Sequence, residues 1–136
     1  MNFQINHLQH IGLPVTSLER SEAFYNRLGF KNIMAAHFDF NGDRGHVKML
    51  QHKNIILELY QMPAAELEAI KLRGNGHIDH FAFDVSDIDL AFNELKAEGF
   101  IIDEPAPVFL NFWSNGCKYF NVIGPDGERV EFNQIL

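Results

Sequence analysis

Short stretches of alternating apolar and polar residues, separated by a helical pattern and by turn residues, organise the first half of the chain. Residues 5–15 end in the alternating Ile11, Leu13 and Val15, which is typical of a half-buried strand. A helix is predicted next, because Thr16 or Ser17 can cap its first turn and Gly29 can end it. Strands are then predicted at 32–40, 47–51 and 55–60, with a hairpin turn at the Asn-Gly-Asp sequence of 41–43. The predicted order of this half is βαβββ.

The second half repeats this order after a short helix predicted at 63–73. Its predicted elements are a strand at 77–85, a helix at about 87–98, and strands near 100–102, 119–123 and 129–134. Residues 105–116 are expected to form a long aromatic loop. The sequence therefore predicts an α+β fold in one domain, 1–136. Its parts are a βαβββ module at 5–62, a linker helix at 63–76 and a βαβββ module at 77–136.

Residues 7–30 also align with residues 77–100, at a constant offset and without a gap. The matched pairs are His7 with His77, His10 with His80, Val15 with Val85, Gly29 with Gly99, and Phe30 with Phe100. A self-match at fixed period indicates a duplicated structural unit. Two copies are too few for a solenoid, so we expect the halves to face each other around a shared surface.

Alternation also assigns a face to each chemically interesting side chain. If Ile11 packs under the helix, His10 points the other way, and His80 does so in the second half. Two carboxylates, Glu58 in IILELY and Glu131 in RVEFNQ, interrupt otherwise apolar strands. A carboxylate buried in a strand without a partner costs several kcal/mol, so it is normally paired, protonated or bound to metal. Two imidazoles and two carboxylates suit Zn, Ni, Co, Mn or Fe(II) better than Mg or Ca.

Each of these residues has a structural alternative when it is taken alone. Glu58 can pair with a lysine, and Glu131 can face solvent near the end of the chain. The symmetric histidines with one glutamate on the last strand of each half favour a metal site over these alternatives. His7 and His77 lie three residues away, so we expect them on the opposite side of the sheet, where they support the site or mark the start of the strand.

Composition narrows the class of partner. The net charge of −7 excludes a nucleic-acid backbone or an anionic membrane surface as the expected partner, which leaves a small-molecule substrate. No apolar run approaches the roughly 18 residues of a membrane span, no signal peptide is evident and Cys117 is the only cysteine, so we expect a cytoplasmic protein. The thirteen Phe residues suggest an aromatic core or an aromatic cavity. The predicted pocket residues are Phe38, Phe40, Phe112, Trp113 and Phe120.

The stretches HIGLPVTSLERSEAFYNRLGF, ILELY, HFAFDV and GPDGERVEF resemble the vicinal oxygen chelate superfamily, which includes glyoxalase I, bleomycin-resistance proteins and extradiol dioxygenases. The resemblance covers nearly the whole chain. It implies paired βαβββ modules that form a curved, cup-like mixed sheet around a metal, commonly in a homodimer. It also implies His10, Glu58, His80 and Glu131 as metal ligands.

This ligand set is most similar to that of glyoxalase I, because extradiol dioxygenases typically use two histidines and one glutamate. The resemblance therefore implies a metal-dependent lyase or isomerase that transfers a proton next to a carbonyl, as in a 2-oxoaldehyde or its thiol adduct. Glu131 is the first candidate for the base and Glu58 the second. Zn, Ni or Co is the expected metal, with Mn and Fe as alternatives.

Two positions argue against glutathione as part of the substrate. Bacterial glutathione-using glyoxalases carry Arg where this chain has Pro14, and Asn where it has Met62. Other reactions of the same fold therefore remain as alternatives, namely epimerisation, thiol transfer, epoxide opening and dioxygenation. A binding module that sequesters a drug or other ligand is the alternative from a different functional class, and it predicts no catalytic metal.

Overall fold

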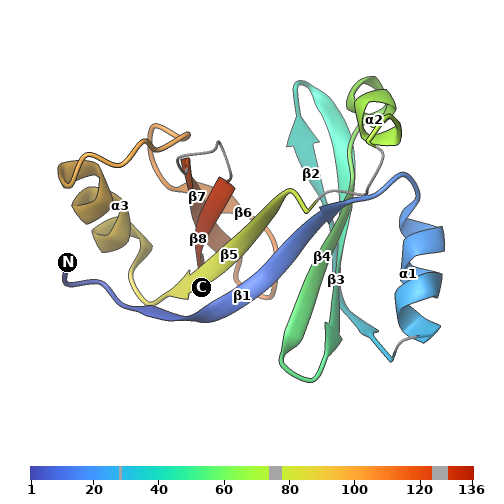
Figure 1. The fold of residues 1–136 in the computed structure, drawn as a ribbon, viewed down its shortest axis with the longest axis horizontal. Helices are drawn as coiled ribbons and strands as arrows, with labels where there is room; N and C mark the ends of the chain where they lie inside the picture. Colours follow the sequence, from blue (N-terminus) through green and yellow to red (C-terminus); the bar gives the residue numbers. More distant parts are fainter. Residues whose placement is uncertain (28, 74–77, 124–128) are drawn as a thin grey trace. The chain divides into compact units, whose positions relative to one another are not determined.

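The computed structural model describes residues 1–27, 29–73, 78–123 and 129–136. Within them the chain forms eight strands and three helices (Figure 1). These are β1 (Ile5–Pro14), α1 (Leu18–Arg27), β2 (Lys31–Phe40), β3 (Asp43–His52), β4 (Ile55–Gln61), α2 (Ala64–Lys71), β5 (His80–Val85), α3 (Ile88–Ala97), β6 (Val108–Leu110), β7 (Cys117–Ile123) and β8 (Arg129–Ile135). The predicted α+β fold of two βαβββ modules is confirmed, with β1-α1-β2-β3-β4 in one and β5-α3-β6-β7-β8 in the other.

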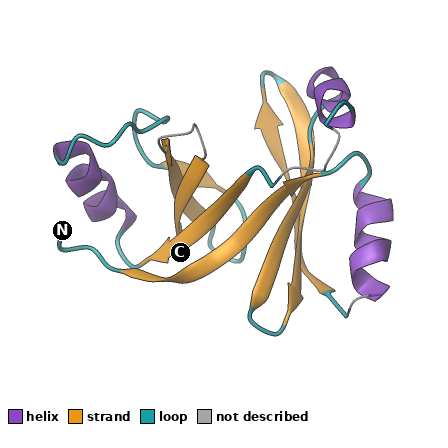
Figure 2. Ribbon diagram, viewed as in Figure 1, coloured by secondary structure: helices purple, strands orange, loops and turns teal. Residues whose placement is uncertain are grey.

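The chain divides into two compact modules, and one strand contributes to both. The first module comprises His10–Asp79, and the second comprises His80–Leu136 together with Met1–Gln9. Strands of the first module follow the order β2-β3-β4-β1, and those of the second follow β5-β8-β7-β6 (Figure 2). In each module the first strand pairs in parallel with the last, and the other pairs are antiparallel.

The first module packs α1 against the sheet formed by its four strands (Figure 1). Its core consists of Leu50, Leu57 and Leu59, and the partly buried side chains of β1 and α1 pack against them. Those side chains include Ile11, Leu13 and Val15, so the predicted apolar face of β1 is confirmed. The opposite face of β1 therefore carries His10.

The second module has the larger core, and α3 covers it. Asp87 caps α3, because its carboxylate accepts a hydrogen bond from the amide of Leu90 at 2.9 Å. Aromatic rings dominate beneath the helix: Phe120 stacks on Phe132 with centroids 5.3 Å apart and meets the edge of Phe92 at 5.2 Å. The N-terminal segment joins this core, since the ring of Phe3 packs on Phe132 at 5.9 Å.

The prediction for residues 100–116 was wrong in two respects. The expected strand near 100–102 is reduced to a single bridge between Ile102 and Val122, and the expected loop contains β6. Prolines at 105 and 107 explain the early end of pairing, because they lack the amide hydrogen that a ladder requires. Glu104 then turns inward, where its carboxylate accepts hydrogen bonds from the backbone amide and the side chain of Asn121.

The remaining boundaries differ from the predictions by a few residues at most. The hairpin turn at 41–43 connects β2 and β3, and Asn41 adopts a positive φ of 49° there. The turn expected at Pro125-Asp126-Gly127 and the matched residue His77 lie outside the described residues. Among the helices that are described, none has the length and apolar character needed to cross a membrane.

We predict that Phe120→Ala lowers the free energy of unfolding by about 3–5 kcal/mol, because Phe120 is fully buried between two rings and the cavity cannot close. Urea denaturation followed by circular dichroism measures this cost. Phe109→Ala in the same module is the control: Phe109 is 57% exposed, and we expect a loss below about 1.5 kcal/mol. Equal losses in the two variants would contradict this account of the core.

We also predict that Glu22 makes a pH-dependent contribution to the free energy of unfolding. Its carboxylate links α1 to Lys48 on β3 and Asn32 on β2. The hydrogen bond from Lys48 lowers the pKa of Glu22 most, and the bond from Asn32 lowers it next. Because the folded-state pKa lies below the usual 4.5, this contribution is fully present above that pH and is lost as the pH falls through the folded value. Glu22→Gln should therefore cost about 0.5–1 kcal/mol near neutral pH and less in acid.

Unfolding free energies of wild type and Glu22→Gln between about pH 7 and pH 3 test this prediction. Lys48→Met is the matched variant, since it removes the largest cause of the lowered pKa and should flatten the acid dependence in the same way. A difference between wild type and Glu22→Gln that stays constant over this range would refute it.

Candidate functional site

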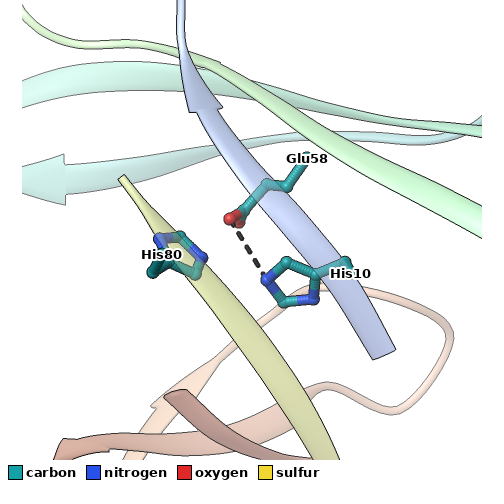
Figure 3. A group of neighbouring side chains, drawn as sticks. All are labelled: His10, Glu58 and His80. Atoms are coloured by element: carbon teal, nitrogen blue, oxygen red, sulfur yellow. Dashed lines mark ion pairs between the residues drawn. The ribbon is translucent and has the colours of Figure 1, made fainter. Parts of the chain in front are cut away.

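A buried histidine and a buried glutamate face each other in the first module. His10 comes from β1, and Glu58 comes from the neighbouring parallel strand β4 (Figure 3). Nε2 of His10 lies 3.3 Å from Oε2 of Glu58, and 2% of His10 and 8% of Glu58 are exposed. Their position follows from strand alternation, because Ile11, between His10 and Gly12, turns to the core under α1.

The second module contains an equivalent pair. His80 lies on β5 and Glu131 on the parallel strand β8, with 3.2 Å between Nε2 of the imidazole and Oε2 of the carboxylate. Both side chains are buried. Here the apolar face of β5 carries Phe83 and Val85, which pack in the core beneath α3.

The strand registers show that the two pairs are equivalent. Gly12, two residues after His10, is paired with Glu58, and Ala82, two residues after His80, is paired with Glu131. Gly and Ala are small, so neither side chain fills the space between the imidazole and the carboxylate. The duplication seen in the sequence therefore extends from the histidines to their acidic partners.

The donor atoms of each pair fit a transition metal. Two ligand atoms about 2.0–2.2 Å from one Zn-like ion lie about 3.0–3.5 Å apart in tetrahedral or octahedral geometry. The separations of 3.3 Å and 3.2 Å fall in this range. Imidazole nitrogen with carboxylate oxygen is also the donor combination that Zn, Ni, Co, Mn and Fe accept. The residues present therefore fit a divalent metal.

Sequence reasoning missed a set of polar residues that supports the second pair. Nδ2 of Asn133 donates a hydrogen bond to Oε1 of Glu131 at 2.8 Å, whereas His80 faces the other carboxylate oxygen, Oε2. Nε2 of Gln9 in turn donates to Oδ1 of Asn133 at 3.1 Å and to Oδ1 of Asp84 at 3.2 Å. A signal for Asn133 was available, because it lies two residues after Glu131 and therefore on the same face of β8.

The predicted aromatic pocket residues lie in different environments. Phe120 is part of the hydrophobic core of the second module, which explains its burial without a pocket. Phe112 is also buried, Phe40 is exposed beside the β2–β3 turn, and Phe38 packs against Tyr60 with centroids 6.4 Å apart. Trp113 has a φ of 64°, which is strained for a residue with a large side chain. A pocket role for these five residues stays a prediction.

Two further residues named in the sequence analysis, His7 and Cys117, are not members of the two His–Glu pairs. Nδ1 of His7 lies 3.9 Å from Oδ2 of Asp84, and the side chain of His7 is mostly exposed. Cys117 is fully buried on β7, as expected for a small packing residue.

Comparison with known proteins gives a family match over almost the whole chain. The model described as the Glyoxalase/Bleomycin resistance protein/Dioxygenase superfamily matches residues 7–132. The chain is also 30% identical to YwbC of Bacillus subtilis (strain 168), an uncharacterized protein, over 93% of this chain and 96% of that protein.

Two solved structures illustrate the similarity in fold. The hypothetical protein BH1468 from Bacillus halodurans C-125 is 26% identical, with a TM-score of 0.75 over 96% of this chain and 94% of that chain. Methylmalonyl-CoA epimerase from Mycobacterium tuberculosis is 17% identical, with a TM-score of 0.78 over 100% of this chain and 92% of that chain. At that identity the second similarity concerns the fold alone.

Proposed function

Because this chain belongs to the glyoxalase, bleomycin resistance and dioxygenase superfamily, we propose that it is a metal-dependent lyase or isomerase of glyoxalase I type. In this reaction a proton leaves the carbon next to a carbonyl group and is returned to the neighbouring carbon. The substrate is a small 2-oxoaldehyde or its thiol adduct. The observation that carries the proposal is the pair of equivalent, buried His–Glu contacts, one in each module. A protein that only sequesters a ligand has no need to keep both pairs.

The proposed ligands of the metal are His10, Glu58, His80 and Glu131. Each arrangement of the two pairs, within one chain or across two copies of it in a homodimer, supplies two imidazole nitrogens and two carboxylates. Zn, Ni and Co are favoured, with Mn and Fe as alternatives, because the donors are nitrogen and oxygen. A bound divalent ion supplies Lewis-acid stabilisation of negative charge that develops on the substrate's carbonyl oxygen.

The proton transfer is assigned to the chain's own carboxylates. Glu131 takes the proton from the carbon next to the carbonyl and returns it to the neighbouring carbon, with Glu58 as the second candidate base. Burial of the carboxylate supports this role, because a proton held away from bulk water can be returned to the substrate before it exchanges. Oε1 of Glu131 accepts the hydrogen bond from Asn133, and Oε2 of Glu131 is the oxygen that faces His80.

Epimerisation of an acyl thioester is the second candidate function. It uses the same removal and return of a proton next to a carbonyl. Two observations favour it: Pro14 and Met62 replace the residues expected to hold glutathione, and the full length of the chain matches the fold of a methylmalonyl-CoA epimerase. The two candidates differ in substrate and share the base and the metal ligands.

We predict that the protein binds about one Zn, Ni or Co ion per chain, and that alanine at any of the four ligands lowers metal affinity more than about 100-fold. The reason is that even outer-sphere partners of a metal ligand change affinity by about 10–100-fold. Elemental analysis of untagged protein and calorimetric titration measure both quantities. His37→Ala, at an exposed histidine of β2, is the matched control and should bind as wild type does. Full affinity in His80→Ala or Glu131→Ala would exclude the four-ligand site.

We predict that the metal-loaded protein turns over either the hemithioacetal of methylglyoxal and glutathione or methylmalonyl-CoA. The product formed in D₂O shows, by mass spectrometry, whether the transferred proton exchanges with solvent. Glu131→Gln should lower kcat by about 10²–10⁴-fold, the usual contribution of a general base. Glu68→Gln, an exposed glutamate on α2, is the control and should keep full activity. No turnover of either substrate, combined with oxygen uptake on a catechol, would replace the proposal with a dioxygenase.

A further inference from the structure

A line of hydrogen bonds in the second module runs from Asp84 to Glu131. Oδ1 of Asp84 accepts from Nε2 of Gln9 at 3.2 Å, and the same nitrogen donates to Oδ1 of Asn133 at 3.1 Å. Nδ2 of Asn133 then donates to Oε1 of Glu131 at 2.8 Å. Three of these residues come from different parts of the chain: Gln9 from β1, Asp84 from β5 and Asn133 from β8.

The chemistry of the groups fixes the direction of each amide in this line. A carboxylate only accepts hydrogen bonds, so Asp84 requires the NH₂ group of Gln9 to point towards it. That NH₂ group also meets the oxygen of Asn133, and the NH₂ group of Asn133 consequently faces Glu131. With its amide reversed, Asn133 would place a carbonyl oxygen against the carboxylate of Glu131, which is repulsive.

Burial makes this orientation costly to change. Gln9 is 3% exposed and Asn133 4%, so water does not compete for their hydrogen bonds. The far end of the line is held as well, because Oδ2 of Asp84 accepts a hydrogen bond from Nδ2 of Asn6 at 2.7 Å.

The first module has different residues at the corresponding positions. In the second module Asp84 is paired with Asn133, and in the first module Pro14 is paired with Tyr60. Pro14 has no polar side-chain atom, and Tyr60 carries a hydroxyl at the end of a ring in place of an amide. At these two positions the first module therefore lacks the carboxylate of Asp84 and the amide of Asn133.

We propose that Asn133, oriented by Gln9 and Asp84, is a positioning residue that makes Glu131 a one-oxygen ligand. The amide holds Oε1, so that only Oε2 is presented on the side of His80 and to the metal. This inference rests on the proposed metal-dependent function. Its consequence is that Glu131 would offer one oxygen atom, and not two, to a bound metal.

Asn133→Leu tests the inference, because leucine keeps the size and shape of asparagine and removes the donor. Metal affinity should fall about 10–100-fold, the range typical for loss of a hydrogen-bond partner of a metal ligand. In Co²⁺-loaded protein, release of Oε1 allows Glu131 to bind through both oxygens. The visible absorption of Co²⁺ should therefore weaken, as it does when coordination number rises.

Two further variants separate this role from general packing. Gln9→Met removes the amide that orients Asn133, and it should lower metal affinity by less than Asn133→Leu does. Gln9→Met also keeps the proposal testable if Asn133→Leu does not fold. Gln134→Ala removes a neighbouring amide of β8 whose bonds go to Ile88 and Ser86 at the start of α3. This control should lose stability and keep both the metal affinity and the Co²⁺ spectrum.

Each result has one meaning. Wild-type protein that takes up no metal overturns the proposed function and the inference together. Metal binding by wild type, with unchanged affinity and Co²⁺ spectrum in Asn133→Leu and Gln9→Met, overturns the inference alone. A loss of affinity in Gln134→Ala as large as in Asn133→Leu also overturns it, because the effect would then come from β8 as a whole.

Discussion

The parallel pairing of a histidine-bearing strand with a glutamate-bearing strand is the interaction on which the site of each module depends. In both modules the glutamate is paired with the second residue after the histidine, so the two side chains share one face. A shift of one residue would turn the glutamate into the apolar core under the helix, at a cost of several kcal/mol. The hydrophobic face of each module therefore fixes the chemistry on the other face.

Much of this arrangement could be predicted from the sequence, because period-two alternation is a local signal. Ile11, Leu13 and Val15 identify the core face of β1, and His10 follows on the other face by geometry alone. Glu58 and Glu131 were visible as charges inside apolar strands. The resemblance to a family added their common role, which alternation by itself left open.

The parts of the site that could not be predicted depend on contacts between residues far apart in the sequence. Gln9 neighbours His10, so alternation places it on the opposite face and gives no reason to connect it with Glu131. Its partner Asn133 lies 124 residues further along the chain. The aromatic residues were ambiguous for a related reason, since a ring in a strand has the same sequence signature in a core and in a pocket. Phe120 belongs to the core because α3 covers it through Phe92.

The division of β1 between the two modules has a consequence for how the chain folds. Met1–Gln9 packs with residues that follow position 79, so residues far apart in the sequence contact each other. The Gln9–Asn133 contact closes a loop of nearly the whole chain, and contacts of that kind form slowly because of the entropy lost on closure. During synthesis the His10–Asp79 module can form before residues 80–136 are available, whereas residues 1–9 pack only with those later residues. The support of Glu131 is thus among the last parts of the molecule to assemble.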